Sequence, residues 1–93
     1  MVVVTFKLHG KTEKVLEISQ SLKGIAEKVK KVEGCKETKV YQDTDNENIF
    51  FLVEEWQKQR HLDDHMKSSL FAALLGFKGL LAKEPEIKFM NVD

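Results

Sequence analysis

The segment EEWQKQRHLDDH, from Glu54 to His65, gathers most of the residue types in this chain that could do chemistry. It holds the only Trp and the only Arg of the chain and two of its three His. An imidazole such as that of His65 can exchange protons near neutral pH. The indole of Trp56 offers a flat apolar wall and one N–H donor. These residue types suit proton transfer beside an aromatic-sized ligand.

The strand that leads into this segment predicts the walls of such a site. Because side chains alternate between the faces of a strand, one face carries Phe50, Leu52, Glu54 and Trp56. Phe6, in the first apolar run, is expected to point the same way from a neighbouring strand. We therefore expect a pocket with mostly apolar walls.

Structural roles remain open for the same residues. Trp56 is equally well explained as a core anchor at a strand end, and His65 as a residue that orders the junction between two helices. At least one of Glu54 and Glu55 is expected to be a charged side chain that faces solvent at the strand end.

Other site chemistries have weaker support. His61 and His65 are four residues apart, as in metal-binding helices, but no further His or Cys has convincing spacing, so no metal site is expected. The single Cys35 is equally well explained as a small buried residue at a strand start. Gly76 and Gly79 lie in an apolar helical run rather than in a phosphate-binding motif.

Hydrophobic periodicity predicts the elements that must position these residues. In order they are a strand at 2–8, a helix from 13 to about 32, strands at 35–42 and 49–56, helices at about 58–66 and 69–81, and a strand at 86–92. Thr12 is the expected N-cap of the first helix, and Gly34 the expected left-handed residue after it. This order predicts one α+β domain over residues 1–93, with the ferredoxin-like βαββαβ arrangement and a four-stranded antiparallel sheet.

The third strand predicts a second copy of the chain as a partner. Helices cover only one face of such a sheet, yet Phe51 and Val53 make the other face of this strand apolar too. We expect a homodimer that packs two sheets face to face.

Composition narrows the other partners. The chain has 15 basic and 15 acidic residues, so no net positive charge favours nucleic acid or an anionic membrane. The third strand also ends in Glu54 and Glu55 and lacks the motif of RNA-binding sheets. A lone Cys and the lack of a signal-peptide pattern favour a cytoplasmic protein.

The stretch FFLVEEWQKQRHLDDHMKSSLF resembles the central motif of the antibiotic biosynthesis monooxygenase (ABM) family. In that motif an apolar strand ends in Glu-x-Trp, and a His, a Ser and an aromatic residue follow. The matching residues here are Glu54, Trp56, His65, Ser68 and Phe71. The resemblance also covers EGC, DTDNEN and PEIKFMNV, and thus nearly the whole chain.

This resemblance implies a dimeric α+β barrel that oxidises a quinol, an anthrone or a related phenol with molecular oxygen and needs neither metal nor flavin. It implies His65 and Trp56 as catalytic residues. A substrate would contact Phe6, Phe50, Leu52, Glu54 and Phe71.

The chain departs from the family at several positions. Anthrone-oxidising members carry an Asn where this chain has Leu52. Phe6, His65 and Leu75 replace the Asn, Trp and His that haem-degrading members use, so haem ligation in that manner is not expected. The loss of polar groups indicates either another substrate or a non-catalytic dimer that binds an aromatic or apolar metabolite.

Overall fold

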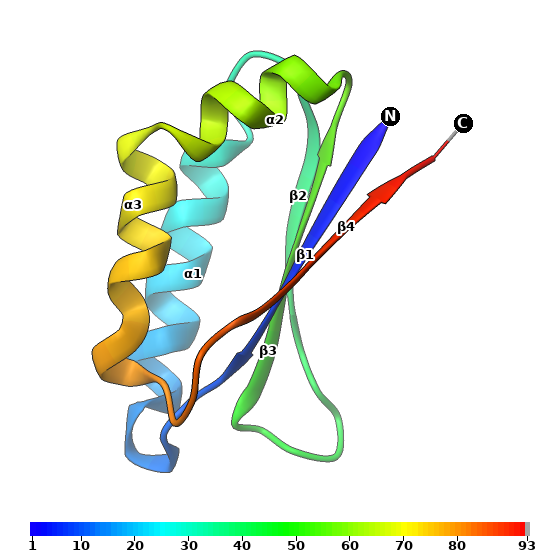
Figure 1. The fold of residues 1–93 in the computed structure, drawn as a ribbon. Coiled ribbons are helices and arrows are strands. Elements are labelled where there is room, and N and C mark those ends of the chain that lie inside the picture. Colours follow the sequence, from blue (N-terminus) through cyan, green and yellow to red (C-terminus); the bar gives the residue numbers. More distant parts are fainter. Residues whose placement is uncertain (93) are drawn as a thin grey trace.

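The computed structural model describes residues 1–92 as one antiparallel sheet with helices on a single face (Figure 1). The elements are β1 (Val2–His9), α1 (Val15–Val29), β2 (Cys35–Gln42), β3 (Ile49–Trp56), α2 (Gln59–Met66), α3 (Ser69–Leu75) and β4 (Glu86–Asn91), with 3₁₀ helices at Thr12–Lys14 and Gly76–Leu80. The strand order is β2-β3-β1-β4. The predicted ferredoxin-like fold is confirmed, with the two most apolar strands in the middle. Asp93, the last residue of the predicted domain, lies outside the described residues.

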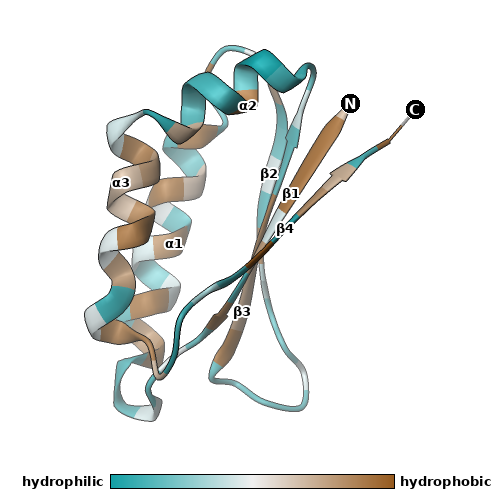
Figure 2. Ribbon diagram, in the orientation of Figure 1, coloured by the Kyte–Doolittle hydropathy of each residue, from teal (hydrophilic) through white to brown (hydrophobic). Residues whose placement is uncertain are grey.

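The core lies between the sheet and the helices. Burial alternates along β1 and β3, because every second side chain faces the helices. The pairs Phe6–Leu52 and Val4–Glu54 lie opposite each other on this inner face. Figure 2 shows apolar residues along β1 and α3, whereas α2 is mostly polar. The short α2 therefore depends on a few buried side chains to hold it against the sheet: His61, Leu62 and His65.

The outer face of the sheet is partly apolar, as expected from β3. Phe51 and Val53 are half-buried there, and Met90 on β4 is 55% exposed. The ammonium of Lys7 lies 5.8 Å from the centroid of the Phe51 ring. Such a cation covers part of an aromatic surface, so the outer face mixes apolar and charged groups.

Several helix ends differ from expectation. The first helix, expected to reach about residue 32, ends at Val29. Thr12 does not cap α1, which begins at Val15; its hydroxyl instead accepts a hydrogen bond of 2.8 Å from the Asn48 amide. The helix expected at 69–81 ends at Leu75 and continues as a 3₁₀ helix from Gly76. A spacing of three residues suits either helix type, so the apolar pattern does not distinguish them.

No helix within residues 1–92 combines the length and the apolarity that a membrane crossing requires.

Candidate functional site

A buried cluster of polar and aromatic side chains lies where β3 meets α2. Glu54 and Trp56 lie at the C-terminal end of β3. Their side chains point toward the helices, and both are fully buried. His65, from the last turn of α2, is 2% exposed. The structure thus brings together three of the residues that the sequence indicates, and none of them faces bulk solvent.

One carboxylate oxygen organises this cluster. Oε1 of Glu54 accepts a hydrogen bond of 3.1 Å from the indole Nε1–H of Trp56. The same oxygen lies 3.5 Å from Nε2 of His65. The Trp56 and His65 rings are near neighbours, with centroids 4.7 Å apart and planes inclined by 32°. The indole N–H that was expected to serve a ligand is therefore engaged by Glu54.

Ser68 lies at the other nitrogen of His65. Its hydroxyl donates to the backbone carbonyl of His65 at 2.6 Å and accepts from the backbone N–H of Phe71 at 3.3 Å. Its oxygen is also 3.5 Å from Nδ1 of His65. Because the one hydroxyl hydrogen is used on the carbonyl, this oxygen faces Nδ1 as an acceptor. A protonated His65 would thus have an acceptor at each ring nitrogen.

Aromatic rings surround the polar cluster. Phe71 on α3 meets the His65 ring edge-on at 6.1 Å and the Phe6 ring at 6.1 Å. Leu52 is buried directly opposite Phe6. Phe50 shares the inner face and pairs with Leu8. It is the next inward residue beyond Leu52 and is therefore farther from Glu54 than Leu52 is. These apolar side chains pack on the inner face beside the cluster, and Phe50 is the farthest of the predicted β3 residues from it.

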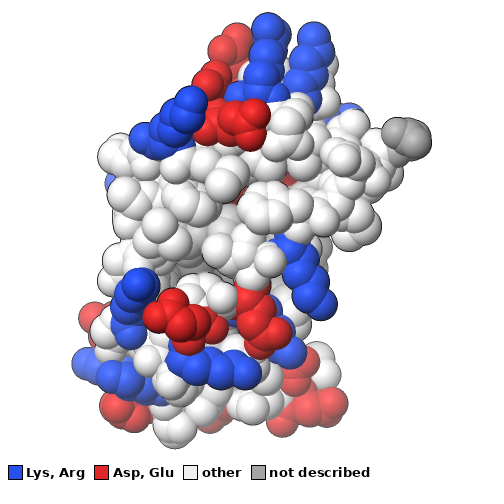
Figure 3. All heavy atoms as spheres, in the orientation of Figure 1, with Lys and Arg blue, Asp and Glu red and all other residues white. Residues whose placement is uncertain are grey.

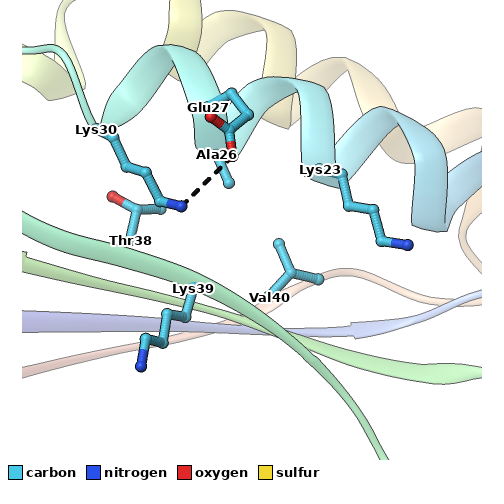
Figure 4. A pocket seen from close by; sticks show the side chains of 7 residues that line it. All are labelled: Lys23, Ala26, Glu27, Lys30, Thr38, Lys39 and Val40. Atoms are coloured by element: carbon cyan, nitrogen blue, oxygen red, sulfur yellow. Dashed lines mark hydrogen bonds and ion pairs between the residues drawn. The ribbon is translucent and has the colours of Figure 1, made fainter.

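Two surface hollows are not lined by these residues, although Thr38, the cross-strand partner of Glu54, lines one of them. One, of about 220 Å³, opens between α1 and β2 and is lined by Lys23, Ala26, Glu27, Lys30, Thr38, Lys39 and Val40 (Figure 4). The other, of about 260 Å³, is on the outer face of the sheet, beside Lys7 and Phe51. Glu54, Trp56 and His65 are instead buried by the side chains packed around them.

Cys35 has the environment of a structural thiol. Burial raises the pKa of its thiol, more than the Thr38 hydroxyl, 3.1 Å away, lowers it, and the charge of Glu54 raises it further. A raised pKa keeps the thiol protonated and weakly nucleophilic at neutral pH. Thr38 is fully buried and is not among the predicted site residues. Its place on the inward face of β2 is the sequence signal that could have indicated it.

His61 and His65 do not form a metal pair with further ligands. His61 lies against Gly34, and its Nδ1 is buried without a protein partner. His65 lies against Trp56 and Glu54. Within residues 1–92, no group of three or more His, Cys, Asp or Glu side chains is placed to hold a metal ion.

Comparison with known proteins places the chain in a family. The family model for antibiotic biosynthesis monooxygenases matches residues 1–75. No curated protein matches the chain in sequence. Among solved structures, a conserved protein of Methanosarcina mazei Go1 is 33% identical, with a TM-score of 0.90 over 99% of this chain and 92% of that one.

More distant structures share the fold. A candidate antibiotic biosynthesis monooxygenase of Deinococcus radiodurans is 21% identical, with a TM-score of 0.92 over 100% of this chain and 93% of that one. A Bacteroides thetaiotaomicron protein of unknown function, described as a possible oxidoreductase, is 20% identical. Its TM-score is 0.80 over 96% of this chain and 92% of that one. With the family model covering most of its length, this chain belongs to the antibiotic biosynthesis monooxygenase family.

Proposed function

We propose that this protein is a monooxygenase that oxidises a quinol, an anthrone or a related aromatic phenol with molecular oxygen. One observation carries the proposal beyond family membership: Glu54, Trp56 and His65 form a buried cluster in which two ring nitrogens face one carboxylate oxygen. A carboxylate and an imidazole in contact can take up one proton as a unit. Such a pair suits the removal of a proton from a hydroxyl group.

Proton removal is the step that this reaction needs from the protein. A phenol or anthrone becomes electron-rich when deprotonated, and its anion can then pass electrons to oxygen. For an anthrone, the ring CH₂ loses two hydrogens and gains one oxygen atom, and the second oxygen atom leaves with those hydrogens as water. The substrate itself is the reductant, so the proposed reaction uses no resident metal or flavin.

The neighbouring residues have distinct roles in this proposal. His65 and Glu54 hold the proton, and Ser68 gives the protonated imidazole a second acceptor. Trp56 keeps the carboxylate in place through its N–H and offers an aromatic surface. Phe6 and Phe71 exclude water, which strengthens the electrostatic interactions within the site.

We expect protein-dependent oxygen uptake when an anthrone or hydroquinone is mixed with the protein anaerobically and then exposed to oxygen. Uptake should scale with protein concentration and reach one oxygen molecule per anthrone converted. An oxygen electrode and mass spectrometry with ¹⁸O₂ measure the two quantities. Binding of these compounds without any protein-dependent uptake would contradict the enzyme and favour a non-catalytic binder.

We also propose a homodimer that packs the outer faces of two sheets together. The support is the half-buried Phe51 and Val53 and the exposed Met90 on that face. Light scattering coupled to size-exclusion chromatography is expected to give twice the 10.7 kDa mass of the chain. Val53→Lys, which adds a charge to the outer face alone, should shift the mass toward the monomer. A monomeric unaltered chain at micromolar concentration would contradict this arrangement.

A further inference from the structure

The second carboxylate oxygen of Glu54 is buried and has no protein partner. Oε1 accepts from Trp56 and lies beside His65, but Oε2 has no hydrogen-bond donor within reach. The side chain as a whole is 1% exposed. A buried carboxylate oxygen without a donor is unfavourable, so this atom is suited to accept a hydrogen from a group that enters the site.

The inner face of the sheet on the β1 and β4 side of Glu54 is apolar and aromatic. Phe89 on β4, Val4 on β1 and Glu54 on β3 are direct neighbours across three strands, so their side chains share the inner face. Phe89 is 55% exposed, because the helices do not extend over this edge strand. Phe71, from α3, is half-buried beside the rings of Phe6 and His65. A ligand that enters between α3 and β4 would cross aromatic surface before it meets a polar group.

Uncharged side chains cover much of the inner side of this edge. Figure 3 shows charged side chains mainly toward the two ends of the face that bears α3 and β4, with a largely uncharged band between them and a basic side chain at its border beside β4. The carboxylate of Glu54 would repel an anionic ligand strongly, because the site contains little water to screen the charges.

We propose that Oε2 of Glu54 accepts the hydroxyl hydrogen of a neutral aromatic ligand that lies on the inner face between α3 and β4. The aromatic class of ligand rests on the proposed function; the contact atom and the selection for a neutral hydroxyl donor are new. In the reactive step the ligand O–H bond breaks, its hydrogen passes to Oε2, and the electron pair stays on the ligand oxygen. The negative charge then lies on the ligand oxygen and Glu54 is neutral, while His65 stays in contact through Oε1.

This assignment predicts selection by hydrogen-bonding capacity and charge. 2-Naphthol carries a hydroxyl donor and is neutral at pH 7. 2-Methoxynaphthalene has no donor, and 2-naphthoate is an anion of similar size. We expect 2-naphthol to bind about 10–100-fold more tightly than the ether, since a bond to a charged acceptor is lost, and 2-naphthoate to bind more weakly than either.

The single Trp supplies a direct measurement. Trp56 gives the only indole N–H signal in a ¹H–¹⁵N spectrum of ¹⁵N-labelled protein, and that N–H donates to Glu54. Ligand at Oε2 should move this signal in a saturable titration, under anaerobic conditions so that no oxidation occurs. The unaltered protein alone therefore tests the proposal. An indole signal that 2-naphthol leaves unmoved, or moves no more readily than the ether does, would overturn it.

Glu54→Gln tests the residue. The Gln oxygen can still accept from Trp56 and His65, but its amide N–H₂ then faces the ligand as a donor. The preference for 2-naphthol over the ether should fall to within about 3-fold, and 2-naphthoate should bind about 10-fold more tightly than it does to the unaltered protein. Glu55→Gln is the matched control, because it removes the same charge from the other face of β3 and should leave all three affinities unchanged. If Glu54→Gln kept the same preference among the three compounds, a group other than Glu54 would recognise the hydroxyl, and the proposal would be wrong.

Binding and oxidation can fail separately. Selective binding of 2-naphthol that depends on Glu54, without oxygen uptake for any anthrone or hydroquinone, would uphold this inference and reject the monooxygenase. Oxygen uptake that survives Glu54→Gln undiminished would reject the role of Glu54 and leave the monooxygenase standing.

Discussion

Replacing His65 with Gln is expected to lower turnover of the oxidised substrate by roughly 10²–10⁴-fold, the usual contribution of a positioned acid or base. Gln retains an N–H donor for Oε1 of Glu54, which lies 3.5 Å from Nε2 in the native chain. It cannot, however, take up a proton. The expected change in the free energy of unfolding is therefore small, below about 1 kcal/mol for one exchanged hydrogen bond. Steady-state oxygen uptake and thermal melts on the same preparation measure both.

The matched control is His61→Gln. His61 lies one turn earlier on the same face of α2, is also buried, and contacts Gly34 rather than Glu54. Its replacement should leave turnover within about 2-fold, because it has no contact with the proposed proton-accepting pair. If both variants retained full turnover, His65 would be a structural residue. An equal loss in both would point to a general disturbance of α2.

The sequence predicted those parts of the site that depend on local periodicity. Alternation along β3 determined that Glu54, Trp56 and Leu52 share the inner face, because a strand has only two faces. The bounds of β2 and β3 agree with prediction for the same reason. The charged β2 lies at an edge of the sheet, where charge discourages unwanted pairing.

Contacts between elements were less predictable. The pairing of Trp56 with Glu54, and of His65 with the same oxygen, depends on how α2 returns over the end of β3. No local pattern encodes that turn. Ser68 was visible in the motif, but its position beside Nδ1 of His65 requires the bend between α2 and α3.

Long-range partners also explain the error at Thr12. Its hydroxyl serves Asn48, 36 residues away, instead of capping α1. A local N-cap signal cannot show such a competing partner. Gly34 illustrates the opposite case: its positive φ of 84° confirms the predicted left-handed conformation, although α1 has already ended at Val29.

Gly34 also connects the fold to the site, because its backbone and its missing side chain both matter. Its carbonyl accepts a hydrogen bond of 2.8 Å from the backbone N–H of Gln57, the residue after Trp56. The imidazole of His61 occupies the space where a Cβ on Gly34 would stand. This close approach holds the start of α2 against the turn that precedes β2. Glycine is thus required here for two independent reasons, conformation and space.

Gly34→Ala is therefore expected to destabilise the fold by on the order of 2–4 kcal/mol, from left-handed backbone strain and the clash with the His61 ring. In a domain of this size the melting temperature should fall by roughly 10–25 °C, measured by circular dichroism. Gly24→Ala is the matched control: Gly24 is exposed within α1, where an added methyl meets nothing within 4 Å. That change should instead stabilise the helix by about 0.5–1 kcal/mol. A Gly34→Ala protein that melts like the native chain would show that His61 can leave its position without cost.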